Sequence, residues 1–222
     1  MNWNCRLLCL PSALAIVLAC GVAAEAGAKI LPREQALQAI QNPRDVQARR
    51  QGAEALGETG LMVDVPLLTE ALRDPDAKVR ALAEQSLWQV WSRSGDAEVD
   101  RLFLRGVEQM QRQDLTEAIE TFGEIIRKKP DFAEGWNKRA TLYYLVGEYA
   151  KSLADCDEVM KRNPVHFGAL SGYGMIYLQL GKPQLALPYF EHALAVNPNL
   201  AGIEQAVRDI EEYLKQQQKG TI

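Results

Sequence analysis

Residues 133–166 read AEGWNKRATLYYLVGEYAKSLADCDEVMKRNPVH, and this stretch decides the fold because the sequence on either side of it follows the same pattern. Three consecutive segments of 34 residues each carry a proline at the same register, namely Pro130, Pro164 and Pro198. A proline cannot continue a helix, so each one separates a helical unit from the next. Self-similarity at this period indicates stacked units that share a continuous core.

Small and large side chains recur in register within the three segments. Four residues after a large apolar side chain comes a small one, which lets two helices approach closely: Gly106, Ala140 and Gly174. This pattern resembles the tetratricopeptide repeat, a helix–turn–helix unit with the consensus W-x2-L-G-x2-Y, A-x3-F and a closing proline. The resemblance covers 99–200 and implies an all-α, right-handed superhelix with repeats at 99–132, 133–166 and 167–200.

Several positions inside the repeats carry their own expectations. Gly147 and Gly181 fall between the two helices of their repeats, where a tight turn needs a positive φ angle, and Gln113 takes this place in the first repeat. Pro188 removes a backbone donor from the second helix of the third repeat, so we expect that helix to be bent or to start late. Cys156 stands where the other repeats have phenylalanine. We expect it to be buried, with intermolecular pairing as the alternative.

A second helical module is expected over 31–95, before the repeats. Its segment Ala48-Arg49-x-x-Gly52-x-x-x-Leu56 recurs 31 residues later as Val79-Arg80-x-x-Ala83-x-x-x-Leu87. The module is similar to HEAT-type repeats, in the short variety that is also found in bilin lyases. This resemblance implies that an aspartate and an arginine six residues apart, Asp74 and Arg80, link neighbouring units.

Two tryptophans, Trp88 and Trp91, lie on one helical face at the end of this module. We expect a hydrophobic seam that joins the two repeat types into one continuous solenoid; the alternative is an exposed anchor for a partner. The following Gly95 and Asp96 are typical of a helix end and a helix start. Residues 201–217 place apolar side chains on one face, which predicts a helix that caps the solenoid.

The first 28 residues have the layout of a bacterial secretory signal peptide. An apolar run over 7–19 follows Arg6, and small residues with cleavage options follow it. The run is too short to span a membrane. Residues 17–20, VLAC, give an alternative, because they resemble a bacterial lipobox in which Cys20 is lipidated and becomes the N-terminus. We therefore expect a periplasmic or secreted protein, or one anchored by a lipid at Cys20 to an envelope membrane.

The sequence contains no pattern of catalytic residues. Two histidines, His166 and His192, together with Cys156 do not supply the three or four ligands of a metal site. The G-x-S-x-G, phosphate-loop and dinucleotide-binding motifs do not occur. The net charge of −4 argues against a nucleic-acid partner bound through its phosphates. We expect no enzymatic activity, no cofactor, no metal and no transmembrane span.

The expected superhelix offers a concave surface, which the first helix of each repeat lines. The family resemblance implies that a peptide or a partner helix binds there. By register, ten residues are predicted on this surface: Phe103, Val107, Met110, Asn137, Lys138, Thr141, Tyr144, Ser171, Met175 and Leu178. Gly168 and Gly172 lie on one face nearby, and they either admit a ligand close to the backbone or allow tight packing within the fold.

The chemistry of this predicted groove favours an apolar ligand. The family's carboxylate clamp needs several Lys, Arg and Asn side chains, and only Asn137 and Lys138 match it. An amphipathic helix or an extended apolar peptide therefore fits better than an acidic C-terminal peptide of the EEVD type. The leading expectation is a non-catalytic scaffold or adaptor of the bacterial envelope. The alternatives are an accessory of an enzyme of the bilin-lyase kind, a small-molecule binder, and self-association through the same surfaces.

Overall fold

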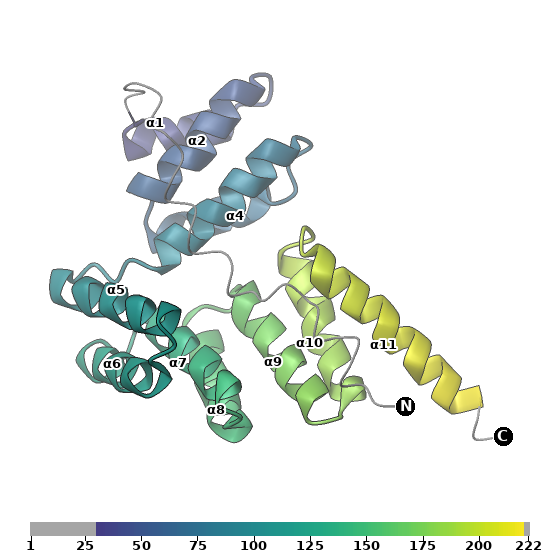
Figure 1. The fold of residues 1–222 in the computed structure, drawn as a ribbon. Helices are drawn as coiled ribbons and strands as arrows, with labels where there is room; N and C mark the ends of the chain where they lie inside the picture. The colour runs from purple at the N-terminus through teal and green to yellow at the C-terminus, as the bar shows by residue number, and fades with distance from the viewer. Residues whose placement is uncertain (1–29, 220–222) are drawn as a thin grey trace.

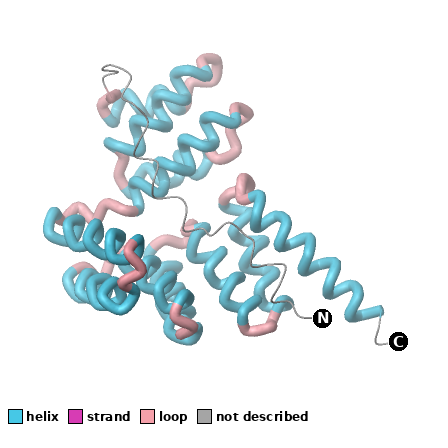
Figure 2. The backbone as a smooth tube through the Cα atoms, in the orientation of Figure 1, coloured by secondary structure: helices cyan, strands magenta, loops and turns pink. Residues whose placement is uncertain are grey.

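The computed structural model describes residues 30–219, so the predicted leader over 1–28 and its Cys20 lie outside the described residues. Within this range all regular elements are helices (Figure 2). The N-terminal part comprises α1 (Arg33–Ile40), α2 (Val46–Thr59), the short 3-10 helix η4 (Met62–Asp64), α3 (Val65–Ala71) and α4 (Ala77–Trp91). It is followed by α5 (Ala97–Gln111), α6 (Leu115–Lys128), α7 (Ala133–Leu145), α8 (Tyr149–Arg162), α9 (Phe167–Gln179), α10 (Pro183–Val196) and α11 (Ala201–Lys219).

The expected all-α superhelix is confirmed (Figure 1). Helices α5 to α10 pack as three successive helix–turn–helix pairs, and α11 packs against α10. The small residues work as the sequence predicts. At Gly106 an added Cβ would lie 2.6 Å from a ring carbon of Phe122, which is the phenylalanine of the same repeat. Close approach of the two helices therefore requires glycine at this position.

The turns between paired helices have the left-handed backbone that the glycines predicted. The φ angles are 79° at Gly147 and 68° at Gly181, and Gln113 adopts 64° although it is not a glycine. The prediction for the last pair is wrong in one respect. Helix α10 begins at Pro183 and runs through Pro188 without a late start. Pro183 occupies the first turn, where no backbone donor is needed, so it starts the helix early.

Aspartates cap several helix starts. The side chain of Asp45 accepts hydrogen bonds from two backbone N–H groups at the start of α2, Asp96 does the same for α5, and Asp76 accepts one for α4. Gly95 precedes the α5 cap with a φ of 78°. These contacts satisfy N–H groups that have no partner inside the helix. The helix start predicted at Asp96 is confirmed, whereas α4 ends at Trp91, ahead of the predicted end at Gly95.

The N-terminal helices pack against the last repeat rather than stacking on the first. One apolar core joins residues of α2 to α4 with Phe167 and Leu170 of α9 and with Ala193 and Val196 of α10. Hydrogen bonds close the same contact, since Arg73 donates to the carbonyl oxygen of Val196 at 3.2 Å. In Figure 1 the N-terminal helices lie across the top, between the α5–α6 pair and the α9–α11 group. The N-terminal helices therefore contact the last repeat directly as well as preceding the first repeat in the chain.

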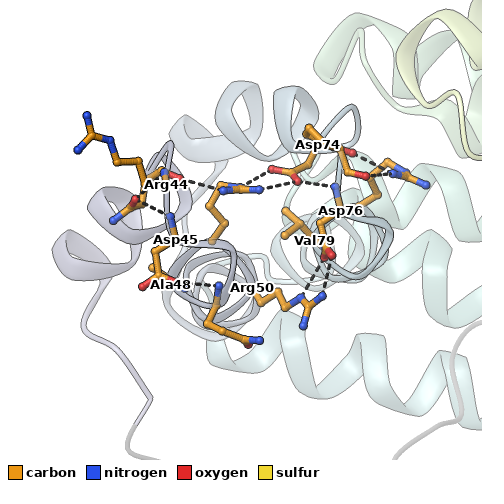
Figure 3. A network of polar contacts seen from close by, with 12 residues as sticks. Arg44, Asp45, Ala48, Arg50, Asp74, Asp76 and Val79 are labelled. Atoms are coloured by element: carbon orange, nitrogen blue, oxygen red, sulfur yellow. Dashed lines mark hydrogen bonds and ion pairs between the residues drawn. The ribbon is translucent and has the colours of Figure 1, made fainter.

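Arginine–aspartate pairs connect successive N-terminal helices (Figure 3). Arg49 Nε lies 2.7 Å from Asp74 Oδ2, and Arg50 Nη2 lies 2.6 Å from Asp76 Oδ2. The predicted Asp74–Arg80 contact exists only through the backbone, because Arg80 Nη1 donates to the carbonyl oxygen of Asp74 at 2.9 Å. Arg80 Nε reaches further, to Asn199 Oδ1 at 2.8 Å in the α10–α11 loop. That loop is thus hydrogen-bonded to the N-terminal helices, since Asn199 Nδ2 also donates to the carbonyl oxygen of Leu72 at 2.8 Å.

Candidate partner-binding groove

The ten predicted groove residues lie on α5, α7 and α9, as their register requires, but they differ in accessibility. Phe103 and Asn137 are buried, and the Phe103 ring packs edge-on against Phe122 and Phe132 at centroid distances of 5.8 and 5.7 Å. Both side chains pack inside the protein, so a partner cannot contact them. The other eight are partly exposed: Val107, Met110, Lys138, Thr141, Tyr144, Ser171, Met175 and Leu178.

A buried polar cluster occupies one half of the groove. Glu134 on α7 is fully buried, and its carboxylate contacts Lys138 Nζ at 3.0 Å and His166 Nε2 at 2.9 Å. Asn137 Nδ2 donates to both carboxylate oxygens at 3.1 Å. Because His166 Nδ1 accepts the N–H of Ala169 at the start of α9, His166 Nε2 carries the proton that it donates to Glu134.

The charge of Glu134 is fixed by these contacts. Burial alone would raise the pKa of Glu134, but the Lys138 ammonium and the hydrogen bond from His166 lower it to about 2. The carboxylate in turn neutralises Lys138, so the two predicted polar groove residues are engaged inside the protein. Sequence reasoning missed Glu134. Its only signal is the four-residue spacing to Lys138, which reads equally well as a surface pair on a helix.

The two tryptophans of α4 cover this cluster. The Trp91 ring stacks on His166 with a centroid distance of 4.5 Å, and Trp88 meets Phe167 edge-on at 5.3 Å. Lys138 Nζ lies 5.7 Å from the centroid of the Trp88 ring, within range of a cation–π contact. The expected hydrophobic seam is therefore present, and it joins α4 to the second and third repeats.

The two glycines near the start of α9, Gly168 and Gly172, differ in how closely they pack. An added Cβ at Gly168 would lie 2.5 Å from the six-membered ring of Trp88, so Gly168 admits a side chain of the same protein. At Gly172 the nearest atom is Cys156 Sγ, at an ordinary 3.6 Å. Tight packing within the fold accounts for Gly168. Among the described residues, neither the Trp88 nor the Trp91 indole N–H has a hydrogen-bond partner.

The remaining predicted groove residues are partly exposed. Tyr144 packs against Tyr149 at a centroid distance of 5.9 Å, and its hydroxyl accepts a hydrogen bond from Gln179 at 3.2 Å. Met175 and Leu178 contact the apolar cluster that α10 and α11 share. The hydroxyls of Thr141 and Ser171 donate to carbonyl oxygens of their own helices. Beside this surface lies a pocket of about 330 Å³, lined by Met110, Gln113, Leu115 and Leu145.

A second pocket, of about 420 Å³, lies on the third repeat and is lined by Tyr177, Leu185, Pro188, Tyr189 and His192. Over residues 30–219, no group of three or more His, Cys, Asp or Glu residues could hold a metal ion. Cys156 is buried, as predicted, and burial raises the pKa of its thiol to about 12, which suppresses its reactivity. Within the same range no helix has the length and apolar character that a bilayer span requires.

Comparison with known proteins agrees with the geometry of the repeats. Two family models, both described as tetratricopeptide repeat, match residues 103–164 and 167–200. A TPR repeat-containing protein of Rhizobium etli is 35% identical over 142 residues, which cover 64% of this chain and 69% of that protein. The outer membrane protein assembly factor BamD of Caulobacter vibrioides is 28% identical over 122 residues, which cover 53% of this chain but only 36% of BamD.

Solved structures share the fold at low sequence identity. The first TPR of Spaghetti (RPAP3), bound to the HSP90 peptide SRMEEVD, superposes with a TM-score of 0.52 at 22% identity and covers 54% of this chain and 96% of that one. The Sgt2 TPR domain of Aspergillus fumigatus gives a TM-score of 0.53 at 18% identity, over 57% of this chain and 85% of that one. At these identities the likeness concerns the helical architecture alone.

Proposed function

Because the chain belongs to the tetratricopeptide repeat family, we propose that it is a non-catalytic scaffold that binds a protein partner in the open half of its concave groove. One observation carries this proposal. Partly exposed apolar side chains of all three repeats remain on the groove beside a pocket of about 330 Å³. The side chains that would contact the partner are Val107, Met110, Thr141, Tyr144, Ser171, Met175 and Leu178.

The ligand of this groove is an apolar peptide or the apolar face of a helix. The Spaghetti structure holds an acidic peptide, whose carboxylates call for free cationic and amide side chains. Here Lys138 and Asn137 both contact Glu134, so a carboxylate ligand would meet a neutralised site. Methionine and tyrosine side chains suit apolar ligands, since they bring large contact area with an adaptable shape.

The proposal places the protein in the bacterial cell envelope. The leader over 1–28 predicts export to the periplasm or secretion, with lipid anchoring at Cys20 as the alternative. The partial similarity to BamD, an outer membrane protein assembly factor, supports this placement. We further propose that α1 to α4 are a HEAT-like module over 31–95, that the repeats occupy 99–200, and that the last helix, over 201–217, caps the solenoid.

The test is a pull-down from envelope extract with the chain 29–222 and a Tyr144→Ala, Met175→Ala double variant. The matched control is Leu104→Ala, which removes an exposed apolar side chain of α5 outside the predicted groove. We expect a protein that the unchanged chain and the control recover and that the folded double variant loses. Equal recovery by all three chains would move the binding site elsewhere, and recovery of no protein would contradict the scaffold proposal.

A further inference from the structure

The turns within the second and third repeats expose apolar side chains. Leu145 and Val146, where α7 ends, are 44% and 45% exposed, and Leu180, where α9 ends, is 40% exposed. Leu185, in the first turn of α10, is 44% exposed. Turns are built mainly from glycine, proline and small polar residues. Single exposed apolar residues are common on protein surfaces, but a contiguous group of them marks an interaction site.

These side chains belong to one strip that crosses all three repeats. The pocket of about 330 Å³ joins the first turn to the second, since residues of both repeats line it: Met110, Gln113, Leu115 and Leu145. The Tyr144 hydroxyl accepts a hydrogen bond from Gln179 at 3.2 Å, so the ends of α7 and α9 also lie side by side. In Figure 1 the α7–α8 and α9–α10 turns lie near the bottom of the view, away from α1 to α4. We call this strip, with its exposed Leu145, Val146, Leu180 and Leu185, the turn edge.

One register position of the turn edge, just before the second helix of each repeat, holds a charged residue: Asp114, Glu148 and Lys182. Glu148 is paired, since Lys151 Nζ lies 3.3 Å from its carboxylate. Asp114 differs from the capping aspartates described above, because its carboxylate accepts no hydrogen bond from the helix start. Both Asp114 and Lys182 are exposed, and among residues 30–219 neither side chain has a hydrogen-bond or ion-pair partner.

The remaining charges near the turn edge keep its two ends opposite in sign. At the first repeat, Arg112 is paired with Glu108 of its own helix at 2.5 Å, and Glu117 adds a second carboxylate in the first turn of α6. At the third repeat, the stretch 174–190 around Lys182 contains no acidic residue. The turn edge is therefore negative at the first repeat, neutral at the second and positive at the third.

We propose that the turn edge binds a second copy of this chain, so that the protein forms a two-fold symmetric dimer. In such a dimer the same surface faces itself with its direction reversed. The second repeat then lies at the axis, where Leu145 and Val146 of the two copies pack together. The first repeat of each copy faces the third repeat of the other, so Asp114 lies opposite Lys182 of the partner subunit, and the symmetry forms this ion pair twice. The dimer does not depend on what the groove binds.

Sedimentation velocity of the chain 29–222 over a range of concentrations measures the dimer. Asp114→Lys and Lys182→Asp each turn both ion pairs into like-charge contacts, so we expect each variant to weaken dimerisation at least about tenfold. Glu54→Lys is the matched control, because it makes the same charge change at an exposed position of α2 outside the turn edge. The control should dimerise as the unchanged chain does, and circular dichroism verifies that every variant is folded.

A mixture of the two variants separates lost charge pairing from structural damage. When the Asp114→Lys chain is mixed with the Lys182→Asp chain, both contacts in the heterodimer again join opposite charges, so we expect heterodimers with about the affinity of the unchanged chain. Damage to the fold in either variant would not be repaired by mixing. An unchanged chain that stays monomeric at every concentration would overturn the proposal. A dimer that both substitutions leave intact, or a mixture that forms no heterodimers, would overturn it as well.

Discussion

At the scale of single residues, the buried Glu134 is the group on which the centre of the protein depends. Its carboxylate is the shared partner of Lys138, His166 and Asn137. Removing one member of a buried charged cluster leaves the others without compensation in a medium that solvates them poorly. The cost of such a change is therefore larger than that of any exposed ion pair in the molecule.

We expect Glu134→Gln to lower the free energy of unfolding by about 3 kcal/mol, because the ammonium of Lys138 loses its carboxylate while it remains mostly buried. Urea denaturation measures the difference. Glu148→Gln is the control, since Glu148 pairs with Lys151 at 3.3 Å on the exposed surface and should cost less than about 0.5 kcal/mol. Equal effects of the two substitutions would contradict the importance of the cluster.

The cluster around Glu134 makes the free energy of unfolding depend on pH in the acid range. The folded-state pKa of Glu134 is about 2 and its ordinary value is 4.5, so its contribution is complete above pH 4.5. The contribution is lost as the pH falls from 4.5 towards 2, because the unfolded chain then binds the proton more readily. Arg33 lowers the pKa of Asp64, and Arg50 lowers the pKa of Asp76, so both aspartates add to the same dependence. Unfolding free energies measured over this range should fall, and Glu134→Gln should flatten the fall.

Gly168 and Gly172 offer a matched pair of substitutions. Gly168→Ala should destabilise the protein by about 2 kcal/mol, because the new methyl group meets the Trp88 ring in a packed interface. Gly172→Ala should be neutral or stabilising by about 0.5 kcal/mol, since it has room and improves helix propensity. Thermal unfolding of both variants checks this difference. A greater loss at Gly172 would show that the interface is arranged differently.

At the scale of elements, the sequence predicted the helix pairs well and the individual environments less well. The repeat period, the turn glycines and the aspartate caps are local signals, and the structure confirms the turns at Gly147 and Gly181 and the helix start at Asp96. The late start expected from Pro188 is wrong, because Pro183 fits the first turn of α10. The burial of Phe103 and Asn137 has no signal in the repeat pattern, since Phe103 packs against Phe122 and Phe132 and Asn137 donates to the buried Glu134.

The turn between α5 and α6 has Gln113 at the position where the other two repeats have glycine, and glycine should be the more stable residue there. Gln113 has a φ of 64°, a conformation that costs a residue with a side chain about 1 kcal/mol relative to glycine. We therefore expect Gln113→Gly to stabilise the protein by about 1 kcal/mol in urea denaturation. Gly147→Ala, at a φ of 79°, should destabilise it for the same reason. A loss of stability in Gln113→Gly would mean that the glutamine side chain has a further role.

At the scale of the whole molecule, the decisive feature is the packing of the N-terminal helices on the last repeat. Sequence reasoning placed two modules end to end, because repeat patterns describe neighbours along the chain. The contacts that close the molecule come from residues outside both consensus patterns, such as His166, Gly168 and Asn199. No repeat pattern in the sequence predicts these contacts, so the packing of the N-terminal helices on the last repeat is seen only in the structure.

This packing predicts that the repeats depend on the helices before them. A chain that starts at residue 96 would expose Phe167, Leu170 and Val196, which are buried in the shared core. Each of these three buried apolar side chains contributes about 1.5 kcal/mol or more, so the free energy of unfolding should fall by at least about 4.5 kcal/mol. Calorimetry of 96–222 beside 30–222 measures the loss. Equal stability of the two chains would show that the repeats fold independently.

The contacts of α4 with the second and third repeats have a mechanical consequence. Helix α4 is joined through a short loop to the first repeat, touches Lys138 in the second and is packed into the third. Helix α4 therefore connects the first repeat to the third and limits how far the two can move apart. A solenoid whose first and last repeats are not connected in this way can change its pitch and widen, and so accept ligands of different lengths. If the groove binds a ligand as proposed, its span is set in advance, so the ligand must match a fixed length and pays no energetic cost for bending its receptor.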